Sequence, residues 1–164
     1  MSFVSRVTAR YQVVATEGWQ TATGRGVSAP LKLLLDRGLI PEGSRVLDYG
    51  CGRGADVAHL QSLGYDAVGY DPKWRPEKPT GKFDIITCVY VLNVRDEATG
   101  DEIIADIKNH LAPGGKAFIS VRRDLPEEGA PGKGGCWQRL VACPNGFATI
   151  PSTPKGYAIF TKGL

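Results

Sequence analysis

A glycine-rich segment preceded by an acid is the part of the sequence best suited to bind a small molecule. Residues 46–55 read VLDYGCGRGA and place glycines at positions 50, 52 and 54, between a predicted strand and a predicted helix. Glycines in such a loop allow the backbone to approach a ligand closely. Asp48 adds a negative charge two residues before the first of these glycines. The ligand must therefore tolerate a carboxylate beside the loop.

Two ligands fit the glycine spacing, and the charge of Asp48 separates them. Gly50, Gly52 and Ala55 satisfy the loose dinucleotide pattern G-x-G-x-x-G/A. A dinucleotide would place its pyrophosphate over this loop, where a nearby carboxylate would cost on the order of 1 kcal/mol or more. S-adenosylmethionine has no phosphate and carries an α-ammonium and a sulfonium group, which an acid can attract. Asp48 therefore favours S-adenosylmethionine.

A second acid, Asp71, ends the next predicted strand (AVGYD), 23 residues after Asp48. An acid at this point can accept both hydrogen bonds of a ribose diol. It could instead cap the turn before Pro72, and the sequence leaves both interpretations open. The first interpretation supports a nucleoside ligand with either candidate cofactor.

The order of the predicted elements indicates an α/β fold with a Rossmann-like, doubly wound sheet. Strands are expected at 45–49, 66–71, 83–89 and 116–121, with two further strands near 136–141 and 156–161. Helices are expected after Ser28, at 54–63, and from a capping box at 99–102 to the Ala-Pro-Gly-Gly segment at 112–115. Ligands of such sheets bind beyond the carboxyl ends of the strands, where the glycine loop lies.

The composition is that of a globular protein with one domain: 164 residues, of which 42% are hydrophobic and 23% charged. No apolar run reaches the roughly 18 residues of a membrane span, and the first residues lack a secretory signal. We therefore expect a cytoplasmic protein without a membrane partner. The net charge of +3 is below that of a dedicated nucleic-acid binder. The four cysteines form no C-x-x-C pair, so we expect buried thiols and no metal site.

Residues 1–27 have mixed polarity and include Trp19 and a Thr-Gly-Arg-Gly stretch that contains Arg25. We expect this segment to be an N-terminal arm or lid that closes over the site. Residues 28–164 are then expected to form the domain itself.

Three segments together resemble the class I S-adenosylmethionine-dependent methyltransferases. VLDYGCGRG followed by GYD is similar to motif I and the ribose acid of that family, FDIITCVYVLNV to its fourth-strand motif, and LAPGGKAFISV to its helix-to-fifth-strand segment. The resemblance covers roughly residues 28–125 and, more loosely, the strand pair to residue 164. With GYDP and VRRD at 121–124, the sequence also resembles a bacterial group of methyltransferases associated with DNA phosphorothioation genes.

The resemblance implies transfer of a methyl group from S-adenosylmethionine, without a metal, to a small-molecule or nucleic-acid acceptor. Tyr90 and Asn93, in YVLNV, should face the methyl group and contact the acceptor. Asn93 occupies the place where many small-molecule enzymes of this class carry a histidine, and an amide cannot serve as an efficient base. The residues expected to bind the cofactor are Asp48, Tyr49, Gly50, Cys51, Gly52, Gly54, Asp71, Pro72, Trp74, Val89 and Tyr90.

One departure from the family concerns the edge of the sheet. Only eleven residues, PKWRPEKPTGK, separate Asp71 from Phe83, and three of them are proline. A helix and a third strand do not fit there. We therefore predict about six strands, mostly parallel with an antiparallel C-terminal strand, and the loss of the usual third strand. The usual adenine contact is then missing, and Trp74 or Tyr70 could stack on adenine instead. Trp74 could equally cover the bare sheet edge.

The acceptor is not specified by any motif. The D/N-P-P-F/Y motif of amino-DNA methyltransferases is absent, and Cys143 precedes a proline where cytosine-C5 enzymes have the cysteine after one. Arg122, Arg123 and Asp124 leave the fifth strand toward the same face and could hold an anionic acceptor. Two other functions stay open: an inactive scaffold that binds the cofactor, and a nucleotide-dependent oxidoreductase.

Overall fold

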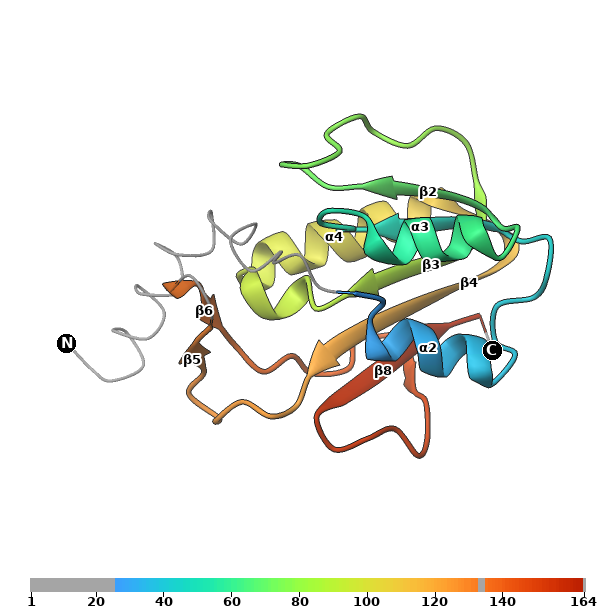
Figure 1. Cartoon of the computed structure of the whole chain (residues 1–164). Coiled ribbons are helices and arrows are strands. Elements are labelled where there is room, and N and C mark those ends of the chain that lie inside the picture. The colour runs from blue at the N-terminus through green and yellow to red at the C-terminus, as the bar shows by residue number, and fades with distance from the viewer. Residues whose placement is uncertain (1–25, 133–134, 164) are drawn as a thin grey trace.

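The structure is a computed structural model that describes residues 26–132 and 135–163. A mixed sheet with helices on both faces dominates it (Figure 1). The helices are α2 (Ala29–Asp36), α3 (Ala55–Ser62) and α4 (Glu97–His110), with a 3₁₀ turn, η2 (Leu92–Val94). The strands are β1 (Arg45–Tyr49), β2 (Asp66–Tyr70), β3 (Phe83–Val89), β4 (Leu111–Arg122), β5 (Ala130–Pro131), β6 (Trp137–Gln138), β7 (Ala148–Thr149) and β8 (Tyr157–Lys162).

The main sheet has six strands in the order β2-β1-β3-β4-β8-β7. The first four are parallel, β8 is antiparallel to β4, and β7 is antiparallel to β8. No strand lies between β2 and β3 in residues 71–82, so β2 forms the edge of the sheet. The predicted α/β sheet, with its antiparallel C-terminal strand and without the usual third strand, is thereby confirmed.

Two buried clusters fasten the helices to opposite faces of the sheet. One cluster contains Ile107 of α4 and Leu47 of β1, and the other contains Leu31 of α2, Leu60 of α3 and Val46 of β1. Neighbouring strand residues point to opposite faces, which is why Val46 and Leu47 belong to different clusters. Figure 1 shows α2 and α3 in front of the sheet and α4 behind it. The sheet is therefore doubly wound, and its parallel strands end together at the edge where ligands bind.

Helix α4 begins earlier than predicted. Its N-cap is Asp96, whose carboxylate accepts a hydrogen bond from the Thr99 backbone N–H at 3.0 Å. The predicted capping box at 99–102 was therefore wrong, because Asp96 already satisfies the first turn. The Ala-Pro-Gly-Gly segment at 112–115 belongs to β4, which starts at Leu111 with an irregularity in its pairing with β3.

The strand predicted at 136–141 is reduced to β6, which pairs with β5 in a separate two-stranded sheet. The cause is visible at Arg139, whose backbone N–H donates to the Asn93 carbonyl at 2.8 Å. That bond attaches the segment after β6 to the η2 turn, so this segment does not continue as a strand. The sixth strand of the main sheet is instead β7, which the sequence did not reveal.

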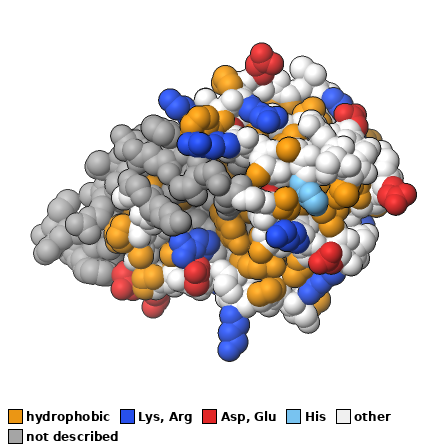
Figure 2. Space-filling view, in the orientation of Figure 1, with side chains coloured by type: hydrophobic (Ala, Val, Ile, Leu, Met, Phe, Trp, Pro, Cys, Tyr) orange, Lys and Arg blue, Asp and Glu red, His pale blue; other side chains and the backbone are white. Residues whose placement is uncertain are grey.

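The expected N-terminal arm, including Trp19 and Arg25, lies outside the described residues apart from positions 26 and 27. Among the helices of residues 26–132 and 135–163, none has the length and apolar character needed to cross a membrane. Figure 2 shows basic, acidic and apolar side chains interspersed on the face in view.

Candidate active site

A cavity of about 570 Å³ opens at the carboxyl ends of the four parallel strands. Its size lies within the range of about 300–1,000 Å³ that is usual for small-molecule sites. All expected cofactor residues except Trp74 line it: Asp48, Tyr49, Gly50, Cys51, Gly52, Gly54, Asp71, Pro72, Val89 and Tyr90. The structure therefore brings residues from three strands together around one cavity.

The glycine loop is held in place by the end of β2. The backbone N–H groups of Gly50 and Cys51 both donate to the Tyr70 carbonyl, at 2.7 and 3.0 Å. Gly50 has a φ of 79°, and a Cβ there would lie 2.3 Å from Val91 Cγ2. Only glycine fits this position, because any other residue would be strained at a positive φ and its Cβ would clash with Val91. Gly54, with a φ of 87°, caps α3 and turns the chain into that helix.

Asp48 lies at the carboxyl end of β1 and is only 3% exposed. Its Oδ1 accepts a hydrogen bond from the Thr87 hydroxyl of β3 at 2.9 Å. A buried carboxylate is costly unless it is hydrogen-bonded or meets a positive charge. The cavity wall thus contains a hydrogen-bonded carboxylate at the end of β1, two residues before the glycine loop.

Asp71 joins the glycine loop to the turn that follows β2. One carboxylate oxygen accepts from the Gly52 N–H at 3.0 Å, and the other accepts from the N–H groups of Lys73 and Trp74, at 2.8 and 3.0 Å. Asp71 therefore does cap the turn after Pro72. A carboxylate accepts about four hydrogen bonds, so a position for a ribose hydroxyl is left on it.

Two further loop residues contribute shape to the cavity. Burial and, next, the charge of Asp48 raise the pKa of the Cys51 thiol to about 12, so this thiol is neutral and serves as an apolar wall. Tyr49 donates its hydroxyl to Asp106 of α4 at 2.6 Å. Burial and this hydrogen bond raise the pKa of Tyr49 well above its usual value. Neither residue is an acid or base near neutral pH.

Trp74 differs from the expectation, since it does not line the cavity. Its side chain is 37% exposed, and the Arg53 guanidinium lies 4.6 Å from its ring centroid. The aromatic face is thus covered by an arginine of the glycine loop, in a cation–π contact. Tyr70, the other residue considered for stacking, does line the cavity.

Tyr90 and Asn93 are separated by the structure. Tyr90 lines the cavity beyond β3 with a φ of 59°, which is uncommon for a residue with a side chain and typical of functional sites. Asn93 is fully buried and outside the cavity lining. Its Oδ1 accepts from the Arg122 N–H and its Nδ2 donates to the Arg139 carbonyl, both at 2.8 Å. Asn93 therefore holds other segments in place and is not aimed at an acceptor.

Residues 20–141, more than half of the chain, match the model of a family described as "Methyltransferase domain". The chain belongs to this methyltransferase family. The resemblance to the class I S-adenosylmethionine-dependent methyltransferases is thereby confirmed.

Solved structures with the same fold are also methyltransferases. The 1,6-didemethyltoxoflavin-N1-methyltransferase of Burkholderia thailandensis, with its substrate and S-adenosylhomocysteine, has a TM-score of 0.62 and 18% identity over 98% of this chain and 90% of that chain. The glycopeptide N-methyltransferase MtfA has a TM-score of 0.60 and 16% identity over 81% of this chain and 88% of that chain. At these identities the likeness shows the fold. No curated protein gives a significant match.

Several residues of the methyltransferase cavity had not been predicted as site residues. Beyond β3 and β4 these residues are Val91, Val94, Arg95, Thr99, Ile103 and Gln138, and near the glycine loop they are Arg53, Ala55, Asp56 and Lys73. Arg122 and Tyr70, which the sequence had suggested for the acceptor and for adenine, also line the cavity. Gln138 had no signal in the sequence, because only the docking of the β5–β6 hairpin brings it to the sheet. Among the described residues of the methyltransferase, no three His, Cys, Asp or Glu side chains are grouped to hold a metal ion.

Proposed function

We propose that this methyltransferase binds S-adenosylmethionine in the cavity at the ends of β1 and β2 and passes its methyl group to a small-molecule or nucleic-acid acceptor. The observation that carries the proposal is the buried carboxylate of Asp48 two residues before a glycine loop, in a chain of the methyltransferase family. MtfA, of the same fold, has been crystallised with S-adenosylmethionine, which supports the same cofactor here.

The residues present fit this cofactor. Asp48 offers a negative group for the α-ammonium or sulfonium, and Asp71 keeps an acceptor position for a ribose hydroxyl. The glycine loop brings the backbone close to the ligand, and the neutral Cys51 thiol lines an apolar part of the wall. When bound, the cofactor supplies an activated methyl group, and the protein supplies alignment and a site with little water.

The test compares two ligands that share a nucleoside and differ in charge. Calorimetry should show binding of S-adenosylhomocysteine and none of NADH, whose pyrophosphate the Asp48 carboxylate repels. Binding of NADH alone would instead support an oxidoreductase. Tritium-labelled S-adenosylmethionine is then offered with DNA, RNA, protein and metabolite pools. Cofactor binding without transfer to any pool would support the inactive scaffold.

A further inference from the structure

The acids that line the cavity all lie at one end of it. Asp48, Asp56 and Asp71 line the part formed by β1, β2 and the start of α3, which also contains Arg53 and Lys73. The part beyond β3 and β4 contains two arginines, Arg95 and Arg122, and no Asp, Glu, His or Lys among the described lining residues. The strand order places β4 three strand spacings, about 14 Å, from β2. The acidic part suits a cationic methyl donor, and the basic part is left for the acceptor.

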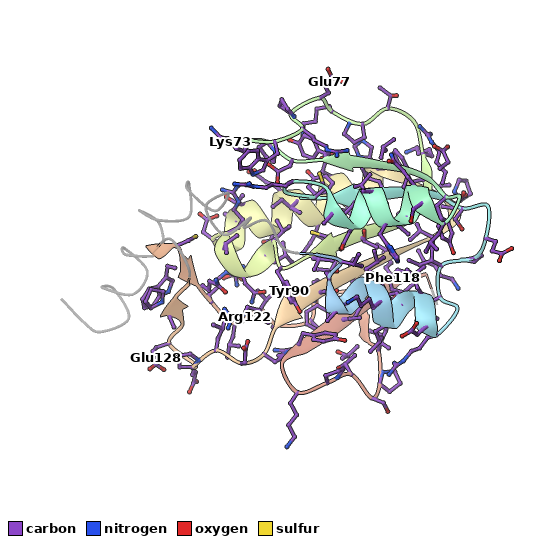
Figure 3. All side chains as sticks on the ribbon, viewed as in Figure 1. Lys73, Glu77, Tyr90, Phe118, Arg122 and Glu128 are labelled. Carbon is purple, nitrogen blue, oxygen red and sulfur yellow. The ribbon has the colours of Figure 1, made fainter. Side chains whose placement is uncertain are left out.

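Arg122 is held in one orientation at this basic end. Its Nε and Nη2 donate to the two oxygens of Asp124 at 2.8 and 2.9 Å, and its Nη1 donates to Gln138 Oε1 at 2.7 Å. These bonds use three of the five guanidinium N–H groups. Within the described part of the chain nothing accepts from the other two, one on each terminal nitrogen. Figure 3 shows Arg122 beside Tyr90 at the ends of the central strands, well apart from Lys73.

The chemistry available at this end restricts the acceptor. None of the described lining residues at this end has an ordinary pKa close to 7, so none of them is suited to remove a proton from a hydroxyl acceptor. A protonated amine has only donors and cannot accept a hydrogen bond from Arg122. An acceptor that is already anionic needs no base and can accept from the two remaining N–H groups of Arg122, although Asp124 offsets part of the charge of this arginine.

We propose that the methyl acceptor is a carboxylate, held by the two remaining N–H groups of Arg122 next to Tyr90. This inference rests on the proposed function. In the transfer, a lone pair of the carboxylate oxygen forms a bond to the methyl carbon while the carbon–sulfur bond breaks and its electron pair stays on sulfur. The products are a methyl ester and a neutral thioether, and no proton is transferred. The negative carboxylate and the positive sulfonium are thereby converted into two neutral groups. A site with little water favours this loss of charge.

The test uses matched carboxylate and amide probes, benzoate with benzamide and indole-3-acetate with indole-3-acetamide. Binding is measured by ligand-observed NMR to the protein saturated with S-adenosylhomocysteine. We expect each carboxylate to bind at least tenfold more tightly than its amide. The two N–H groups of a guanidinium form two charge-assisted hydrogen bonds with the two oxygens of a carboxylate, and an amide has only one such oxygen and no charge. Arg122→Gln should abolish this preference. Arg123→Gln is the matched control, since Arg123 lies over the Phe160 ring and outside the cavity lining.

The affinity of each variant for S-adenosylhomocysteine separates the two proposals. If the cofactor product binds but the amides bind as well as the carboxylates, or if no carboxylate binds at millimolar concentration, the acceptor proposal is overturned and the proposed function stands. A carboxylate preference that survives in Arg122→Gln would also overturn it. A variant that still binds S-adenosylhomocysteine is folded, so lost carboxylate binding then reports on Arg122 itself. Base-labile, volatile tritium released from a methylated carboxylic-acid pool would be the supporting activity.

Discussion

Ser28 donates two hydrogen bonds to the carboxylate of Asp56, from its backbone N–H at 2.7 Å and from its hydroxyl at 2.6 Å. Both residues are buried, and the Ser28 hydroxyl also accepts from the Leu31 N–H as the N-cap of α2. Asp56 lies in the first turn of α3 and lines the cavity. One serine therefore ties the start of α2 to the helix that follows the glycine loop.

Ser28→Ala should lower the free energy of unfolding by about 2–4 kcal/mol. The change removes a helix cap and leaves one buried carboxylate oxygen without its hydroxyl donor. Urea denaturation measures the effect. Ser62→Ala is the control, since the Ser62 hydroxyl bonds the His59 carbonyl on the exposed side of α3 and its loss should cost at most about 0.5 kcal/mol. Equal effects in the two variants would contradict the role given to Ser28.

Local patterns in the sequence predicted the strands, loops and connections that depend on residues adjacent in the chain. The strand 83–89, the glycine loop and the short connection after Asp71 each follow from a run of residues in one segment, and the structure has them. The sequence did not predict the positions of side chains that are held by residues distant in the chain. The cavity position of Gln138 results from the bonds of Asn93 and Arg122 to the hairpin segment, which join residues far apart in the chain. The same bonds explain why Asn93, expected to contact the acceptor, is buried outside the cavity lining.

Asp48→Asn should weaken binding of S-adenosylmethionine about tenfold or more, which corresponds to about 1.4 kcal/mol. The amide keeps the shape and can still accept from Thr87, so the fold is preserved while the charge is lost. Calorimetry with S-adenosylmethionine and S-adenosylhomocysteine locates the contact. An equal loss of affinity for both ligands indicates that Asp48 contacts the ammonium group, which both carry. A larger loss for S-adenosylmethionine indicates that Asp48 contacts the sulfonium, which S-adenosylhomocysteine lacks. Asp66→Asn, at an exposed acid on β2, should leave both affinities unchanged. Unchanged affinities in Asp48→Asn would remove this residue from the site.

Asn93→Asp should destabilise the protein by about 2–4 kcal/mol, because it puts a carboxylate oxygen against the Arg139 carbonyl in place of an N–H donor. The bond from the Arg122 N–H to Oδ1 can persist, so the change isolates one interaction. Urea denaturation is the measurement, with Asn145→Asp at an exposed position as the control. Affinity for S-adenosylhomocysteine should change little, since Asn93 is outside the cavity lining. A variant as stable as the wild type would show that these bonds contribute nothing.

Cys51 should resist alkylation even though it lines the cavity. With its pKa raised to about 12, only about one thiol in ten thousand is ionised at pH 8, and the thiolate is the reactive form. Its reactivity should rise about tenfold for each pH unit up to the pKa. Because the charge of Asp48 contributes to the shift, Asp48→Asn should lower the pKa of Cys51 and speed its reaction with iodoacetamide. Mass spectrometry follows each cysteine, with the exposed Cys143 as the internal reference. If Cys51 reacted at pH 8 as fast as Cys143, or if Asp48→Asn left its rate unchanged, the thiol would not be partly buried beside a negative charge as the structure has it.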